Sequence, residues 1–188
     1  MAIVKDPLFQ GFSGKFGDQF VFRQIGGKTH RCKLPAKKKC KKPRTLLEAQ
    51  RQRKFRDSCY YAKEAIHDTA LRPIYESMAG EGRSAYNMAM ADAQKPPTLS
   101  DLKAKGYRGI PGNTIDVRAE DNICVAKVSF TIYSADGAEI ETGEAIPYRY
   151  AWRWRYTVRS VNSKIKGSII RVVAEDLPGN QVVLEHTI

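Results

Sequence analysis

The feature that most constrains the fold of this chain is a change in the spacing of its apolar residues near residue 113. Upstream, apolar side chains recur every three or four residues, which is typical of helices that bury one side. Downstream they alternate with polar side chains, as over residues 126–133, which is typical of strands with one buried face. Prolines and glycines gather between the two patterns, as they do in linkers. The sequence therefore predicts an α+β protein, with a hairpin and helices at residues 1–98, a linker at 99–112 and an all-β sandwich at 113–188.

The longest predicted helix begins after Thr45. Thr45 and Glu48 have the spacing of a capping box, in which each side chain accepts a hydrogen bond from the other residue's backbone N–H. Apolar residues then recur at helical spacing, and we expect them to form one buried stripe: Phe55, Cys59, Ala62 and Ile66. Two shorter helices are predicted at residues 73–79, with Pro73 in the first helical position, and at 84–93. A short helical turn is predicted inside the linker, at residues 99–103.

Glycine-containing turns locate the strands. Gly26-Gly27 separates two β-rich runs, and paired glycines accept the positive φ angles of a tight turn, so residues 14–34 are predicted to form a hairpin. Asp136-Gly137 marks a second hairpin turn, in the C-terminal region. Six short strands bounded by turn signals predict an antiparallel sandwich there. They are residues 115–119, 126–133, 139–145, 150–158, 168–174 and 182–186.

A run of aromatic residues occupies even positions within the predicted sandwich: Tyr148, Tyr150, Trp152, Trp154 and Tyr156. In a regular strand these side chains share one face. Five aromatics on one face exceed what a single sandwich core needs. Two interpretations follow: the first two precede the strand and the rest are core, or some of the five line a contact surface. The candidate protein-interface residues are Tyr148, Tyr150, Trp152 and Trp154.

Positive charge is concentrated in the first part of the chain. Residues 1–109 contain 23 Lys and Arg against 10 Asp and Glu, a balance of +13, whereas residues 110–188 contain 9 against 10, a balance of −1. Residues 28–56 alone contain 13 Lys and Arg in 29 positions. The lysine run at 35–44 is bracketed by prolines and lacks apolar periodicity, so it is predicted to be an extended arm. This asymmetry predicts a polyanionic partner for the first half, either nucleic acid or an acidic protein surface.

The candidate polyanion-binding residues come from the return strand of the hairpin, the arm and the first helix. They are Lys28, Arg31, Lys33, Lys37, Lys38, Lys39, Lys41, Lys42, Arg44, Arg51, Arg53 and Lys54. Lysine dominates this set, which favours sequence-independent contact with phosphates over recognition of bases.

The sequence offers no grouping that predicts catalysis. His30, His67 and His186 do not combine with a nucleophile or a carboxylate in a recognisable pattern, and the four cysteines lack zinc-site spacing. Free thiols in a reducing compartment, a Cys32–Cys40 disulfide and a weak metal site all remain open for the cysteines. We therefore expect no enzymatic activity and no cofactor. The N-terminus lacks the pattern of a secretory signal, and no stretch approaches the ~20 apolar residues of a membrane span, so a cytoplasmic protein without membrane contact is expected.

Two resemblances add an expected fold and role. Segments 115–122, 133–137, 154–156 and 172–180 resemble the immunoglobulin-like domains common in bacterial surface and bacteriophage structural proteins. That resemblance implies an immunoglobulin-like sandwich without the antibody-type disulfide, because Cys124 is the one cysteine there. A second set of residues resembles small proteins of phages and phage-like islands, which implies association with virion or tail-like assemblies. This set comprises residues 14–17, Gly27-Lys28, the basic arm, Thr45, Gln50, Arg53, Phe55 and Ala62.

Taken together, these features predict a non-enzymatic structural protein of virion type, in a capsid-associated, connector or tail position. The basic N-terminal half would anchor it, and the immunoglobulin-like domain would make protein contacts. The expected partners are other structural proteins of a large assembly, in which the chain is oligomeric, with nucleic acid as a further partner of the arm. Its expected location is the virion after synthesis in the host cytoplasm, and otherwise the cytoplasm. The alternative is a sequence-independent DNA- or RNA-binding protein.

Overall fold

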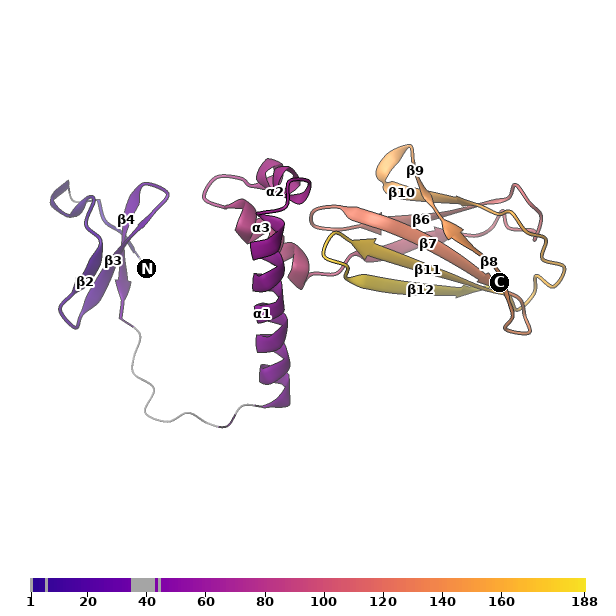
Figure 1. Ribbon diagram of the computed structural model, residues 1–188, viewed down its shortest axis with the longest axis horizontal. Coiled ribbons are helices and arrows are strands. Elements are labelled where there is room, and N and C mark those ends of the chain that lie inside the picture. The colour runs from indigo at the N-terminus through magenta and orange to yellow at the C-terminus, as the bar shows by residue number, and fades with distance from the viewer. Residues whose placement is uncertain (1, 6, 35–42, 44) are drawn as a thin grey trace. The chain divides into compact units, whose positions relative to one another are not determined.

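The computed structural model describes residues 2–5, 7–34, 43 and 45–188 (Figure 1). Its elements, in chain order, are β1 (Ala2–Ile3), a 3-10 helix (Pro7–Phe9), β2 (Gly14–Phe16), β3 (Phe20–Ile25), β4 (Lys28–Lys33), α1 (Leu46–Ala65), α2 (Leu71–Met78), α3 (Ala85–Gln94), β5 (Thr98–Lys103), β6 (Thr114–Glu120), β7 (Val125–Tyr133), β8 (Glu139–Glu144), β9 (Ile146–Tyr148), β10 (Tyr150–Thr157), β11 (Ile169–Asp176) and β12 (Gln181–Thr187). Within these residues, no helix is both long enough and apolar enough to cross a membrane.

The chain divides into two compact units. The first unit comprises residues 1–53 and 79–84, and the second comprises residues 54–78 and 85–188. The second unit therefore contains most of the helical residues together with the C-terminal sheets. The prediction from the sequence had instead placed the helices with the hairpin, at residues 1–98. The overall class is mixed α+β, with antiparallel sheets in both units.

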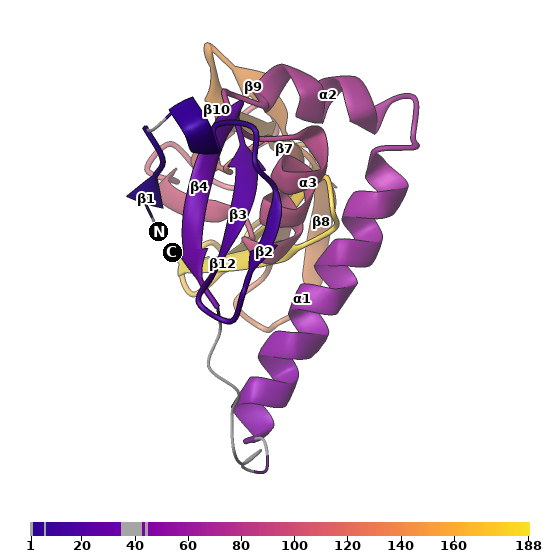
Figure 2. The same ribbon diagram turned by 90° about the vertical axis from the view of Figure 1, so that its left-hand side faces the viewer.

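The N-terminal sheet has the strand order β1-β4-β3-β2, and Figure 2 shows β3 between β2 and β4. The predicted hairpin is confirmed: Ile25 pairs with Lys28, and Gly26 and Gly27 have φ angles of 56° and 71°. These positive angles match the right-handed twist of the flanking strands. Phe22 is the one large apolar side chain buried among the described residues of this sheet. The sheet is therefore held by a small aromatic cluster rather than by an extensive core.

The capping box at the start of α1 is confirmed. The Thr45 backbone N–H donates to Glu48 Oε2 at 3.0 Å, and the Glu48 backbone N–H donates to Thr45 Oγ1 at 3.2 Å. These bonds satisfy N–H groups that the first turn of a helix leaves without partners. The predicted position of this helix is therefore correct at its N-terminal end.

The predicted buried stripe of α1 is confirmed at Ala62 and wrong at Phe55, while Cys59 and Ile66 are half-buried. Phe55 is 51% exposed, and the fully buried positions are Ser58, Ala62 and Ala65. Both sets have helical spacing, so periodicity alone could not distinguish them. The stripe of small residues packs against Tyr75 and neighbouring apolar side chains, because small side chains let a helix approach closely.

The shorter helix α2 begins two residues before Pro73. Asp68 Oδ1 accepts hydrogen bonds from the backbone N–H groups of Ala70 and Leu71, at 2.7 and 3.0 Å, and so acts as the cap. Pro73 then lies in the first turn, where its missing N–H costs no helical hydrogen bond. The predicted third helix is confirmed as α3.

The C-terminal sandwich consists of two four-stranded antiparallel sheets, with orders β5-β6-β10-β9 and β12-β11-β7-β8 (Figure 1). All six predicted strand regions are strands in the structure, because their alternating apolar residues face a common core. Phe130 of β7 and Tyr156 of β10 stack across this core, with ring centroids 5.2 Å apart.

The predicted linker at residues 99–112 instead begins with a strand. β5 pairs with β6, from Thr98 opposite Glu120 to Lys103 opposite Asp116, so the predicted helical turn is wrong. The register shifts between Ser100 and Lys103, and Asp101 has a φ angle of 50°. This bulge interrupts the apolar alternation, which explains why the sequence pattern did not indicate a strand.

Candidate binding surface

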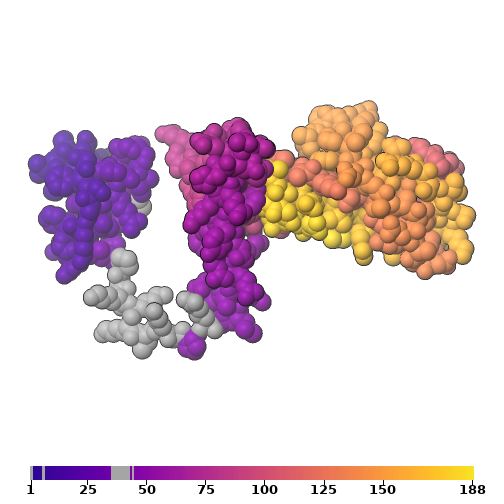
Figure 3. Space-filling view, viewed as in Figure 1, coloured from indigo at the N-terminus to yellow at the C-terminus, as the bar shows by residue number. Residues whose placement is uncertain are grey.

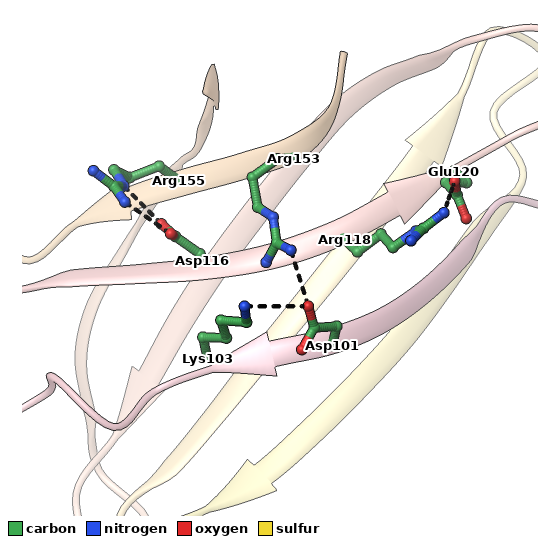
Figure 4. Close-up of polar contacts among 7 residues, drawn as sticks. All are labelled: Asp101, Lys103, Asp116, Arg118, Glu120, Arg153 and Arg155. Carbon is green, nitrogen blue, oxygen red and sulfur yellow. Dashed lines mark hydrogen bonds and ion pairs between the residues drawn. The ribbon is translucent and has the colours of Figure 1, made fainter. Parts of the chain in front are cut away.

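The outward face of the β5-β6-β10-β9 sheet carries a dense array of charged and aromatic side chains. Strand alternation creates it: Ile115, Val117 and Ala119 of β6 point into the core, so the polar residues between them point outward. On β10 the same alternation turns Arg153 and Arg155 outward. Figure 4 shows the resulting polar ladder across three strands. We call this surface the arginine–aromatic face; its residues are Asp101, Lys103, Asp116, Arg118, Glu120, Tyr148, Tyr150, Trp152, Arg153 and Arg155.

Three sets of ion pairs fix the charged side chains of this face (Figure 4). Arg155 makes a two-pronged contact with Asp116, its neighbour across the strands, at 2.7 and 2.8 Å. Arg153 donates to Asp101 at 2.9 Å, and Lys103 lies 3.6 Å from the same carboxylate. Arg118 pairs with Glu120. The planar guanidinium fork suits such carboxylate contacts, so the arginines are held in defined orientations.

The same pairs shift the titration of the groups involved. The hydrogen bond from Arg153 lowers the pKa of Asp101, with Lys103 adding to the effect. The hydrogen bond from Arg118 lowers the pKa of Glu120. Asp116 raises the pKa of the Arg155 guanidinium. These pairs therefore stay ionised at neutral pH.

Aromatic rings stack on the ordered arginines. The Trp152 ring lies 4.7 Å from the Arg118 guanidinium and 5.1 Å from that of Arg153. Tyr150 stacks on the indole at 5.1 Å, with the two ring planes 4° apart. Tyr148 contacts the Arg155 guanidinium at 3.5 Å. These cation–π and stacking contacts make the aromatic groups part of the ordered face.

The hairpin formed by β9 and β10 raises this part of the surface. Figure 3 shows it in orange as a projection from the body of the sandwich. Arg149 forms the turn with a φ angle of 63°, and Tyr150 is 60% exposed. A projecting aromatic group of this kind is accessible to a large partner.

The predicted aromatic face is divided by the structure. The β9–β10 register shifts between Tyr150 and Trp154. The strand is therefore irregular at residues where the prediction assumed that side chains alternate strictly between the two faces. Trp154 is only 7% exposed and belongs to the core with Tyr156, so it is removed from the candidate interface. Tyr148, Tyr150 and Trp152 remain on the outward side, where Tyr148 and Trp152 contact arginines and Tyr150 stacks on Trp152. Those arginines were not among the residues predicted from the sequence, although the alternation of charged and apolar residues over 116–120 and 153–155 was a usable signal.

The predicted polyanion-binding residues fall into three groups. Lys28, Arg31 and Lys33 are exposed on β4, and Arg51, Arg53 and Lys54 are exposed on α1. None of these six makes an ion pair within the part of the chain that the structure describes. Arg31 lies over the Phe20 ring at 5.5 Å. The remaining candidates, which are Lys37, Lys38, Lys39, Lys41, Lys42 and Arg44, lie outside the described residues.

Comparison with known proteins gives only distant similarity, which is to solved structures. No protein-family model matches the chain, and no curated protein matches it. One solved structure, the crystal structure of an engineered protein, is similar at 16% sequence identity with a TM-score of 0.35. The similarity covers 58% of this chain and 30% of the engineered protein.

Proposed function

We propose that this chain is a non-enzymatic structural protein of a virion-type assembly, in a capsid-associated, connector or tail position, and that it contacts other structural proteins through the arginine–aromatic face. The observation that carries the proposal is the placement of Trp152 against two arginines that are themselves held by carboxylates. The same proposal includes three further points: the sandwich is immunoglobulin-like, the chain is located in the virion, and the chain is oligomeric there.

The composition of this face favours a protein partner. Tryptophan, tyrosine and arginine are the residues most enriched at energetic centres of protein interfaces. Its ion-pair network combines four cations with three carboxylates, and such a mixed-sign surface is better matched to a protein than to a polyanion. Because the side chains are already ordered, binding loses less side-chain entropy than it would with free arginines.

The basic N-terminal half supports a second function, sequence-independent binding of DNA or RNA. The observation that favours it is the set of exposed cations on β4 and α1 that lack ion-pair partners within the described residues. Such cations are free to replace counterions on phosphates. In an assembly, the two functions are compatible, with the basic half as an anchor and the sandwich as a contact surface.

The interface proposal is tested by replacing two aromatic residues of the face. The double variant Tyr150→Ala/Trp152→Ala should lose at least about 30-fold in affinity for its protein partner, because two hot-spot residues are removed. The measurement is co-sedimentation of tagged full-length chain with the other proteins of the native assembly. Thermal unfolding should change little, because the truncated side chains lie outside the core.

A matched control uses the exposed aromatics of α1. Phe55 and Tyr60 are 51% and 58% exposed, so Phe55→Ala/Tyr60→Ala removes a comparable amount of accessible aromatic surface. This variant should sediment with the assembly as the unchanged chain does. Equal attachment of both double variants would refute the assigned face, and release of the chain by nuclease would support the nucleic-acid function instead.

A further inference from the structure

Three aspartates from separate segments meet within the second unit. Asp92 lies on α3, Asp121 follows β6, and Asp176 ends β11. One carboxylate oxygen of each lies within 4.8 Å of an oxygen of the other two. Asn180, in the β11–β12 turn, connects the segments by donating to the Asp176 carboxylate at 2.8 Å and toward the Asp92 and Ala93 carbonyls.

Hydrogen bonds hold each carboxylate in place, and those to Asp92 and Asp121 leave one oxygen of each without a partner among the described residues. Asp92 Oδ2 accepts from the Tyr75 hydroxyl at 2.7 Å. Asp121 Oδ2 accepts from the backbone N–H groups of Ile123 and Cys124, at 3.0 and 3.2 Å. Asp176 Oδ1 accepts from the Asn180 N–H at 2.6 Å. The three side chains are therefore oriented by the surrounding protein.

A second observation points to a missing ligand. Asp92 is 0% exposed, yet its Oδ1 has no hydrogen-bond partner in the described part of the molecule, and the buried Oδ1 of Asp121 also lacks one. A buried carboxylate oxygen without a partner costs free energy. Within the described residues, no lysine or arginine forms an ion pair with any of the three carboxylates. Their negative charge therefore requires another source of compensation.

Asp92 and Asp176 are buried and Asp121 lies beside them, so like-charge repulsion and burial make the fully ionised cluster unfavourable without compensation. A proton shared between Asp92 and Asp121 is one way to neutralise the cluster, and a bound cation is the other.

We propose that Asp92, Asp121 and Asp176 bind a divalent cation, and that this cation is Ca²⁺. Calcium takes six to eight oxygen ligands at about 2.3–2.6 Å, so two oxygens on opposite sides of the ion lie up to about 5 Å apart. The three ligand atoms all lie within 4.8 Å of one another, which is inside that span. A site with three protein carboxylates favours Ca²⁺, because Mg²⁺ keeps several waters in a near-octahedral shell and usually takes one or two carboxylates. Of the three aspartates, Asp121 is the one that is partly exposed to solvent.

The cation would join α3 to the end of the sandwich. Asp92 belongs to the helix, and the other two ligands belong to the sandwich, where Ile123 and Leu177 already pack against the helical residues. Binding to the folded state alone stabilises it by RT ln(1 + [Ca²⁺]/Kd), so the stability rises with the calcium concentration. Calcium is thus expected to stabilise the second unit independently of the proposed interface function.

Calcium titration of the full-length chain tests this site. At pH 8, after chelation and removal of bound metal, Ca²⁺ at about 100 times its Kd should shift the folding equilibrium about 100-fold and raise Tm by roughly 5–10 °C. Isothermal titration should give one site per chain. Asp121→Asn should abolish both responses, whereas Asp136→Asn, at an exposed aspartate paired with Lys164, should leave them unchanged.

Two results would overturn the calcium site. The first is no heat and no Tm increase for the unaltered chain at about 10 mM Ca²⁺, which exceeds the Kd of the weakest protein calcium sites; the shared proton would then account for the cluster. The second is an undiminished response in Asp121→Asn. If that variant does not fold, the stoichiometry measured on the unaltered chain still decides, because a value near zero, or well above one, excludes a single built site.

Discussion

Phe130→Ala is expected to lower the free energy of unfolding of the second unit by about 3–5 kcal/mol, the range found for aromatic truncations in well-packed cores. Phe130 is 0% exposed and stacks in parallel on Tyr156, which belongs to the opposite sheet. Its removal therefore loses buried apolar area, leaves a cavity and breaks a contact between the two sheets.

Urea unfolding followed by tryptophan fluorescence measures this loss, because Trp154 lies in the same core. The control is Val183→Ala on β12, where the side chain is 54% exposed. That substitution should change the free energy of unfolding by no more than about 0.5 kcal/mol. A cost below about 1 kcal/mol for Phe130→Ala would show that the core of the sandwich is assigned incorrectly.

In metal-free solution, the second unit should become less stable as the pH rises from about 4 to about 8. Burial raises the pKa of Asp92 from 3.8 to about 7 in the folded state. The folded state therefore binds more protons than the unfolded state in this window, so its stability falls with increasing pH. A shift of this size corresponds to at most about 4 kcal/mol, at roughly 1.4 kcal/mol per pH unit.

Burial gives this effect its sign, and the groups around Asp92 change its size. Asp121 and Asp176 repel its charge, while the Tyr75 hydroxyl donates to it and favours ionisation. The lowered pKa values of Asp101 and Glu120 act in the opposite direction, but only as the pH falls through the acid range where these two groups protonate.

Thermal unfolding as a function of pH measures this dependence. Asp92→Asn should flatten the profile between pH 5 and 8, because the asparagine side chain does not titrate. A stability that rises with pH across this range in the unaltered chain would contradict the assigned burial of the carboxylate.

Local sequence signals predicted local structure well. The capping box of Thr45 and Glu48, the Gly26-Gly27 turn and the alternating strands all depend on residues close together in the chain, and the structure confirms them. The wrong prediction for Phe55 on α1 has a different cause. Which of two equally periodic stripes is buried depends on what packs against the helix, and Tyr75 favours the side with small residues.

The candidate sites show the same contrast between local signals, which the sequence contains, and contacts between distant residues, which it does not. Even spacing correctly drew attention to the aromatics of β10, but only the bulge determines that Trp154 turns inward while Trp152 turns toward Arg118. The aspartate cluster could not be predicted from the sequence, because Asp92, Asp121 and Asp176 are far apart in the chain. No short motif marks such a site when its ligands come from three separate elements.

The central claim is that this chain is a component of a large protein assembly and contacts it through the arginine–aromatic face. Cross-linking of the nuclease-treated native assembly, followed by mass spectrometry, tests it most directly. Lys103 belongs to the face and is 59% exposed, so it should cross-link to another structural protein of the assembly. The same cross-link should be lost in Tyr150→Ala/Trp152→Ala. Recovery of the chain only as a free 21.2 kDa protein, or only on nucleic acid that nuclease removes, would contradict the proposed role.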